Sequence, residues 1–161
     1  MPDKKTLERA RRDKREGKAP STQAGEFVRE EIDHIREGKH GARSTKQAIA
    51  IGLNKARRAG VKLGTPKNVS TQTRRSAQNA TRHAGQKPSP TRSRAVEGAL
   101  KREGHSAVSH AALARQARSS ARRRGATARH RAAQKAVRTK GPAGRRAAAR
   151  KAARTRRRRT A

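Results

Sequence analysis

The large apolar side chains of this chain are few and lie close together. Leu, Ile, Val and Phe number 16 in 161 residues, and nine of these lie between residues 27 and 63. Because burial of such side chains is the main force that offsets the entropy of ordering a chain, only this stretch can hold a core. An apolar share this low, combined with high net charge, is typical of disordered chains and predicts disorder outside this stretch. We therefore expect one small folded module.

The first half of this stretch predicts an amphipathic helix. Ser21 or Thr22 can cap a helix that runs to about Glu37 and ends at Gly38. Four large side chains fall on one face of that helix at 100° per residue. They are Phe27, Val28, Ile32 and Ile35.

A second helix is predicted after a short turn. Ser44 or Thr45 caps it, Lys46 to Ala59 form it, and Gly60 ends it. Two such helices joined by a turn make a helical hairpin, assigned to residues 22–63. Ile51 projects on the polar face, which leaves three readings: a scattered exposed residue, a contact with a partner, or a contact with the apolar residues that follow Gly60.

The rest of the chain is expected to be less ordered. Val108, Leu113 and Val137 are the large apolar residues after Gly104, too few to hold a tertiary core. The predicted fold class is mostly α: a small helical hairpin followed by a long, basic, largely disordered or conditionally helical C-terminal arm. The predicted segments outside the hairpin are a charged disordered N-terminus at 1–21, a linker at 64–93, basic marginal helices at 94–140 and an Arg/Ala-rich disordered tail at 141–161.

The charge of the chain indicates its class of partner. Lys and Arg number 45 against 11 Asp and Glu, for a formal net charge of +34. From Gly104 to Ala161 there are 19 Lys or Arg and no acid. Nucleic acid is the polyanion that such a segment is suited to neutralise, with release of condensed counterions. Phe27 is the single aromatic residue, so stacking on unpaired bases is not expected.

The candidate nucleic-acid-binding residues are basic side chains of the arm and the hairpin. They are Arg57, Arg58, Arg92, Arg115, Arg118, Arg122, Arg123, Arg124, Arg145, Arg146, Arg150, Lys151, Arg154, Arg156, Arg157, Arg158 and Arg159. Arg92 ends the tetrapeptide Ser89-Pro90-Thr91-Arg92, which resembles the minor-groove-binding turns of linker-histone tails. The alternative is an ordinary turn.

A glycine turn before the second helix is a candidate phosphate site. Backbone N–H groups at a helix N-terminus favour anions, and the turn lacks the Gly-Lys-Ser/Thr order of a Walker loop. The alternative is an ordinary helix cap. The residues of this possible phosphate-binding turn are Gly38, Gly41, Ser44, Thr45 and Lys46.

Neither a metal site nor a catalytic site is predicted. Glu31 and His34 have the i, i+3 spacing of helical di-iron sites, but those sites need two such pairs. His105 and His110 have no acid between them, and the chain contains no Cys. No grouping of nucleophile, base and acid is apparent, so we expect no enzyme activity and no cofactor.

Two stretches resemble known proteins. Residues Lys46–Gly60, read as Lys-Gln-Ala-Ile-Ala-Ile-Gly-Leu followed by Ala-Arg-Arg-Ala-Gly, resemble a helix of a family of small, basic, functionally uncharacterised bacterial proteins. That resemblance extends over about residues 25–63, including Gly38–Gly41, and implies a bacterial source without an activity. The Ala/Arg/Lys tail is similar in composition to bacterial histone-H1-like tails.

These observations predict a non-enzymatic nucleic-acid-binding protein, with DNA favoured over RNA and little sequence specificity. An RNA- or ribosome-associated factor is one alternative. Another is an interaction or stress protein that binds a protein partner, or itself, through residues 22–63. The absence of a long apolar run and of a secretory leader favours a cytoplasmic, nucleoid-associated location without a membrane partner.

Overall fold

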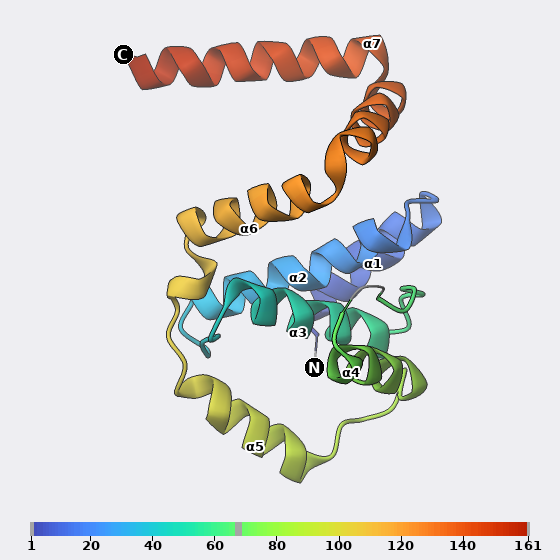
Figure 1. Ribbon diagram of the computed structural model, residues 1–161, viewed down its shortest axis with the longest axis vertical. Helices are drawn as coiled ribbons and strands as arrows, with labels where there is room; N and C mark the ends of the chain where they lie inside the picture. Colours follow the sequence, from blue (N-terminus) through green and yellow to red (C-terminus); the bar gives the residue numbers. More distant parts are fainter. Residues whose placement is uncertain (1, 67–68, 161) are drawn as a thin grey trace. The chain divides into compact units, whose positions relative to one another are not determined.

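The computed structural model of the chain describes residues 2–66 and 69–160 (Figure 1). These residues form seven α-helices and one short 3₁₀ helix, and no strand occurs among them. The prediction of a mostly α protein is therefore confirmed. The chain divides after Gln116 into two compact units, and each is described by itself.

The first unit begins with a helix in a region predicted to be disordered. Helix α1 (Lys4–Arg15) packs along α2 (Pro20–Arg36), as Figure 1 shows. Its buried residues are Thr6, Ala10 and Asp13. Leu7 also contacts the core. The structure differs from the predicted disorder of residues 1–21 because this buried stripe holds a single large apolar residue and gives little periodic signal.

Helices α2 and α3 (Thr45–Arg58) form the predicted hairpin. Helix α2 begins earlier than predicted because Pro20 occupies its first turn, where a missing N–H costs nothing. Ser44 caps α3 as predicted, with its hydroxyl oxygen accepting from the Gln47 backbone N–H at 3.2 Å. Gly38 follows α2 with a φ of 75°, a conformation that favours glycine.

The two helices approach closely at a glycine. A Cβ on Gly52 of α3 would lie 2.6 Å from the Val28 Cα and 3.0 Å from the Phe27 carbonyl oxygen. Both neighbours are backbone atoms of α2, so they cannot move aside as a side chain would. Gly52 therefore sets the distance between the helices.

The core consists of two small clusters. One contains Ala10, Ala24, Phe27 and Ala56, with Leu7, Leu53, Val61 and Leu63 packed against it. The other contains Ile35, Ala42, Ala48 and Val108, with Ile32 and Ala107 packed against it. The core thus lies mainly in the predicted stretch, with additions from α1 and from residues 107–108. Ile51 is partly buried and belongs to neither cluster.

A further helix lies within the predicted linker. Helix α4 (Thr71–Arg82) packs against α3 through Ala77 and Ala80, both buried. Asn54 of α3 donates a side-chain hydrogen bond to Ser76 at 3.2 Å. The sequence gives little sign of this helix, because two alanines are its only buried residues and neither is a large apolar side chain.

The segment after α5 (Pro90–Lys101) returns to the α2–α3 turn. The N–H groups of Gly41 and Ala42 donate to the carbonyls of Leu100 and Gly104 at 2.9 and 3.0 Å. We call residues 100–108 the closing segment; it ends in a 3₁₀ helix, η1 (Ser106–Val108). Val108 is 1% exposed and belongs to the second cluster, so one of the three large apolar residues after Gly104 adds to a core whose other buried members lie between residues 35 and 48.

Helix α6 (His110–Arg123) leads into the second unit, which is made chiefly by α7 (Gly125–Thr160). Gly141 has non-helical backbone angles and Pro142 follows, so α7 consists of two helical segments separated by a kink. The tail predicted to be disordered from residue 141 is helical here. Its many alanines have the highest helix propensity of any residue, which explains the difference.

Candidate nucleic-acid interface

The second unit presents basic side chains without acidic neighbours. Residues 117–160 contain 18 Lys and Arg and no Asp or Glu. Every one of these cations whose side chain is described is exposed, as is Arg115 in the first unit. Arg159, also predicted as a ligand, lies outside the described side chains. The side chains of the predicted arm residues that the structure describes are thus exposed to solvent.

The cations of the arm do not form a single stripe. Eight lie between residues 145 and 158, about 20 Å of helix at 1.5 Å per residue. At 100° per residue they spread over roughly two thirds of the helix circumference. Duplex DNA carries one charge per about 1.7 Å of axis, a comparable density. An arm of this kind can contact phosphates from several directions. It has no single face on which the cations are concentrated.

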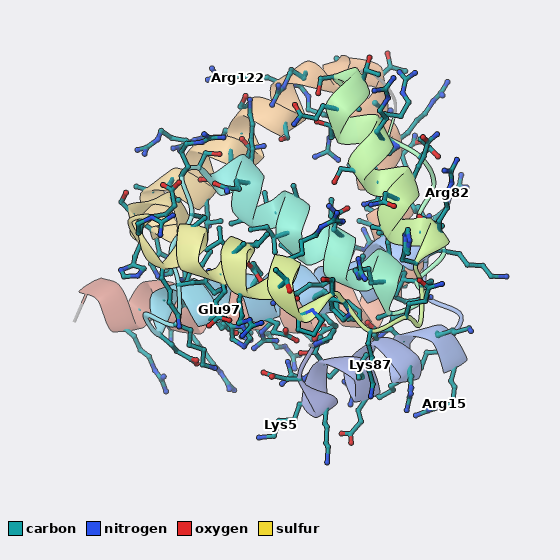
Figure 2. The ribbon with its side chains drawn as sticks, turned by 90° about the horizontal axis from the view of Figure 1, so that it is seen from below. Lys5, Arg15, Arg82, Lys87, Glu97 and Arg122 are labelled. Carbon is teal, nitrogen blue, oxygen red and sulfur yellow. The ribbon has the colours of Figure 1, made fainter. Side chains whose placement is uncertain are left out.

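The first unit also has a basic, acid-free part. Residues 38–96 contain 14 Lys and Arg and no acid. Arg74, Arg75 and Arg82 of α4 are exposed, and Figure 2 shows Arg82 at the periphery of the ribbon. Sequence reasoning omitted these residues because the segment was read as a linker. The absence of acids from residue 38 to residue 96 was the available signal.

Arg57 has a structural position instead of the predicted surface one. It is 7% exposed, and its guanidinium donates to the side chain of Asn54 and the carbonyl of Gly64, both at 3.4 Å. Burial lowers the pKa of Arg57 from its ordinary value. Its neighbour Arg58 is partly exposed, and Arg92 is exposed. Pro90 begins α5, so Arg92 lies in the first turn of a helix and not in a free turn.

The predicted phosphate turn is closed by other parts of the chain. Gly41 is buried, its N–H donates to Leu100, and a Cβ there would overlap the carbonyl of Glu103. Thr45 donates from its hydroxyl to the Ala107 carbonyl at 2.6 Å. Ser44 is occupied as the helix cap, Lys46 is exposed, and Gly38 ends α2. The turn therefore serves as the docking point of the closing segment.

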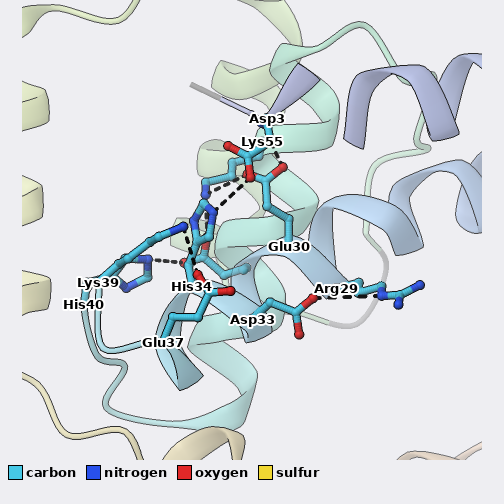
Figure 3. Close-up of polar contacts among 10 residues, drawn as sticks. Asp3, Arg29, Glu30, Asp33, His34, Glu37, Lys39, His40 and Lys55 are labelled. Carbon is cyan, nitrogen blue, oxygen red and sulfur yellow. Dashed lines mark hydrogen bonds and ion pairs between the residues drawn. The ribbon is translucent and has the colours of Figure 1, made fainter. Parts of the chain in front are cut away.

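The fold assembles a charged cluster that the sequence did not predict (Figure 3). Lys55 of α3 lies 2.7 Å from Oε2 of Glu31 and 3.4 Å from Oε1 of Glu30. Nε2 of His40, in the α2–α3 turn, lies 3.4 Å from the other Glu31 oxygen, Oε1. Nε2 of His34 lies 3.3 Å from Oδ2 of Asp3. We call these six residues the histidine–carboxylate cluster.

Two sets of three possible metal ligands lie in this cluster. Ligand atoms of Glu31, His34 and His40 lie within 4.8 Å of one another, and so do those of Asp3, Glu30 and His34. His105 and His110 are exposed and belong to neither set. The sequence revealed only the Glu31–His34 pair, because His40 and Asp3 reach it through tertiary folding.

Among the described residues, no helix combines the length and apolar character that crossing a membrane requires. In comparisons with known proteins, no family model, no curated protein and no solved structure matches the chain.

Proposed function

We propose that this protein binds nucleic acid without catalysing a reaction, with duplex DNA as its principal partner and a nucleoid-associated location. One observation carries the proposal: 18 Lys and Arg in residues 117–160, with no acid among them. Neutralisation of phosphates by such cations releases condensed counterions, which supplies affinity without sequence preference.

The distribution of charge within the first unit supports the same reading. Residues 1–37 contain nine of the 11 acids and have a net charge of +1. Several of these acids are paired locally, as Glu26 is with Arg9 at 3.4 Å and Asp13 is with Lys18 at 2.8 Å. The acids are thus concentrated in α1 and α2, and the acid-free α3–α4 region leaves a positive surface that adds to the arm.

The burial of the single aromatic residue argues against a protein that binds single-stranded nucleic acid by stacking bases on aromatic rings. Such proteins expose several aromatic rings on which bases stack. Phe27 is 1% exposed and lies in the core between α1, α2 and α3. Contacts to the sugar–phosphate backbone therefore remain the best-supported mode of binding.

Removal of the arm tests the proposal. A chain that ends at Gln116 retains the whole first unit and loses 18 cations. We expect the full chain to bind a short duplex with a steep negative slope of log K against log salt, at about −0.9 per phosphate neutralised. The shortened chain should bind much more weakly and with a shallower slope, measured by fluorescence anisotropy between low and physiological salt.

A matched variant separates charge from length. Replacement of the eight cations between residues 145 and 158 by Gln keeps the chain length and a good helix propensity. The slope should become less negative by up to about 7. Unchanged affinity and slope in both altered chains would refute the arm as the binding element and would assign duplex binding to the first unit. Absence of duplex binding by the full chain would favour action of residues 22–63 on a protein partner.

Competition between duplex DNA and structured RNA at the same salt concentration decides between the two nucleic acids. Preference for the duplex supports a DNA-binding role. Preference for folded RNA at equal phosphate concentration would assign the protein to RNA or ribosomes instead.

A further inference from the structure

The two ring nitrogens of His40 face different groups. Its Nδ1 lies 3.1 Å from the carbonyl oxygen of Gly41. Its Nε2 faces Oε1 of Glu31 at 3.4 Å. Glu31 is fully buried at this site.

The separation of these two atoms is one that a metal ion can bridge. Two ligand atoms of a tetrahedral zinc ion, with bonds of about 2.0–2.2 Å, lie roughly 3.3–3.5 Å apart. The observed 3.4 Å is compatible with that arrangement. Neither oxygen of Glu31 has a partner with hydrogen-bond geometry.

His34 supplies a third ligand. It lies one turn from Glu31 on α2, and its ring stands at 89° to that of His40, with centroids 6.3 Å apart. The ligand atoms of the three residues lie within 4.8 Å of one another. The side chains of His34 and His40 are 14% and 13% exposed, which leaves access for an ion from solvent.

The net charge of the histidine–carboxylate cluster is negative and therefore favours a divalent cation. Asp3, Glu30 and Glu31 bring three negative charges, and Lys55 brings one positive charge. The neighbouring charges cancel in pairs, Lys39 with Glu37 and Arg29 with Asp33. Two negative charges therefore remain in a chain whose net charge is +34.

Lys55 and His40 contact different oxygens of Glu31. The ammonium group of Lys55 lies 2.7 Å from Oε2, whereas Nε2 of His40 faces Oε1. Lys55 can therefore hold the Glu31 carboxylate in place, as residues that contact the ligands of a metal ion commonly do. The Gly41 carbonyl orients the His40 ring in the same manner.

We propose that Glu31, His34 and His40 bind a divalent transition-metal ion, with Zn²⁺ as the best match to two imidazoles and one carboxylate. Asp3 and Glu30 share the second ligand set with His34. The ion would tie the α2–α3 turn, and through it the closing segment, to α2. This role is independent of nucleic-acid binding.

Titration of the untagged, chelator-treated full chain with Zn²⁺ alone tests the proposal. Calorimetry should show one saturable site, and Co²⁺ in its place should give the visible absorption of a tetrahedral complex. The variant His40→Gln should bind at least about 100-fold more weakly. His83→Gln is the matched control, because His83 is exposed and belongs to neither ligand set, and it should bind like the unaltered chain.

Circular dichroism verifies that each variant is folded, and His34→Gln provides a second ligand variant if His40→Gln does not fold. Zn²⁺ should also raise the thermal midpoint of the unaltered chain in a concentration-dependent manner, and should not do so for a ligand variant. Absence of saturable binding, equal binding in the ligand variants, or an equal loss in His83→Gln would overturn the proposal.

Discussion

At the scale of single residues, the smallest side chains determine how this protein packs. Five of the eight residues in the two core clusters are alanines, at positions 10, 24, 42, 48 and 56. Alanine buries little apolar surface, so the helices must approach closely to gain contact. Gly52 permits that approach between α2 and α3.

Gly52→Ala should therefore destabilise the protein although alanine favours helix. The new Cβ would meet backbone atoms of α2, at an expected cost of about 1–3 kcal/mol in the free energy of unfolding. Gly25→Ala in α2 is the matched control, since no described atom outside the adjacent residues and the local backbone of α2 lies within 4 Å of its Cβ position. There we expect a gain of about 0.5–1 kcal/mol. Urea unfolding of both variants measures the difference, and equal effects would show that Gly52 does not set the helix spacing.

At the scale of elements, the closing segment links distant parts of the first unit. It supplies Val108 to the second core cluster, and the Arg36 guanidinium donates to the Val108 carbonyl at 3.2 and 3.3 Å. These contacts complete the packing around the α2–α3 turn, which itself contributes only the small side chain of Ala42 to the cluster. The hairpin at 22–63 is thus only part of the folded unit.

Val108→Ala should lower the free energy of unfolding by about 1–3 kcal/mol, because it removes two buried methyl groups and leaves a cavity. Val96→Ala, at a side chain 52% exposed, should change it by no more than about 0.5 kcal/mol. Thermal and urea unfolding compare the two. If both valines can be truncated at equal cost, the closing segment does not contribute to the core.

Different elements were predictable to different degrees, for physical reasons. Helices α2 and α3 follow from caps and from large apolar residues with a helical period, such as Phe27 and Ile35. Helix α4 buries only Ala77 and Ala80, and α1 buries one large side chain in part, Leu7, so their stripes resemble those of solvated helices. The histidine–carboxylate cluster was not predictable, because His40 and Asp3 join Glu31 and His34 through contacts that no local pattern specifies.

At the scale of the whole molecule, the two units differ in what they bury. The first has two core clusters, whereas no described side chain of residues 122–140 is buried even in part. An element without buried contacts opens readily, because little free energy opposes its local unfolding. Lys and Arg are also the residues after which trypsin cleaves.

Limited trypsin digestion should therefore remove the arm first and leave a resistant fragment that ends between residues 115 and 124. Duplex DNA should slow cleavage of the arm, because bound phosphates cover its cations. Mass spectrometry of the fragments over time measures both effects. Cleavage within α2 or α3 at the same rate as in the arm would contradict the division of the chain after Gln116.

The closing segment also has a consequence for the order of folding. Its contacts join residues far apart in sequence, with a separation of 72 residues between Arg36 and Val108. Closure of so long a loop carries an entropic cost that local helix contacts do not, so it tends to occur late. On the ribosome, the hairpin can pair as soon as α3 has been synthesised, but the second core cluster must wait for Val108. Until then Ile35 has an incomplete set of neighbours, and the nascent chain exposes an apolar surface that the finished protein conceals.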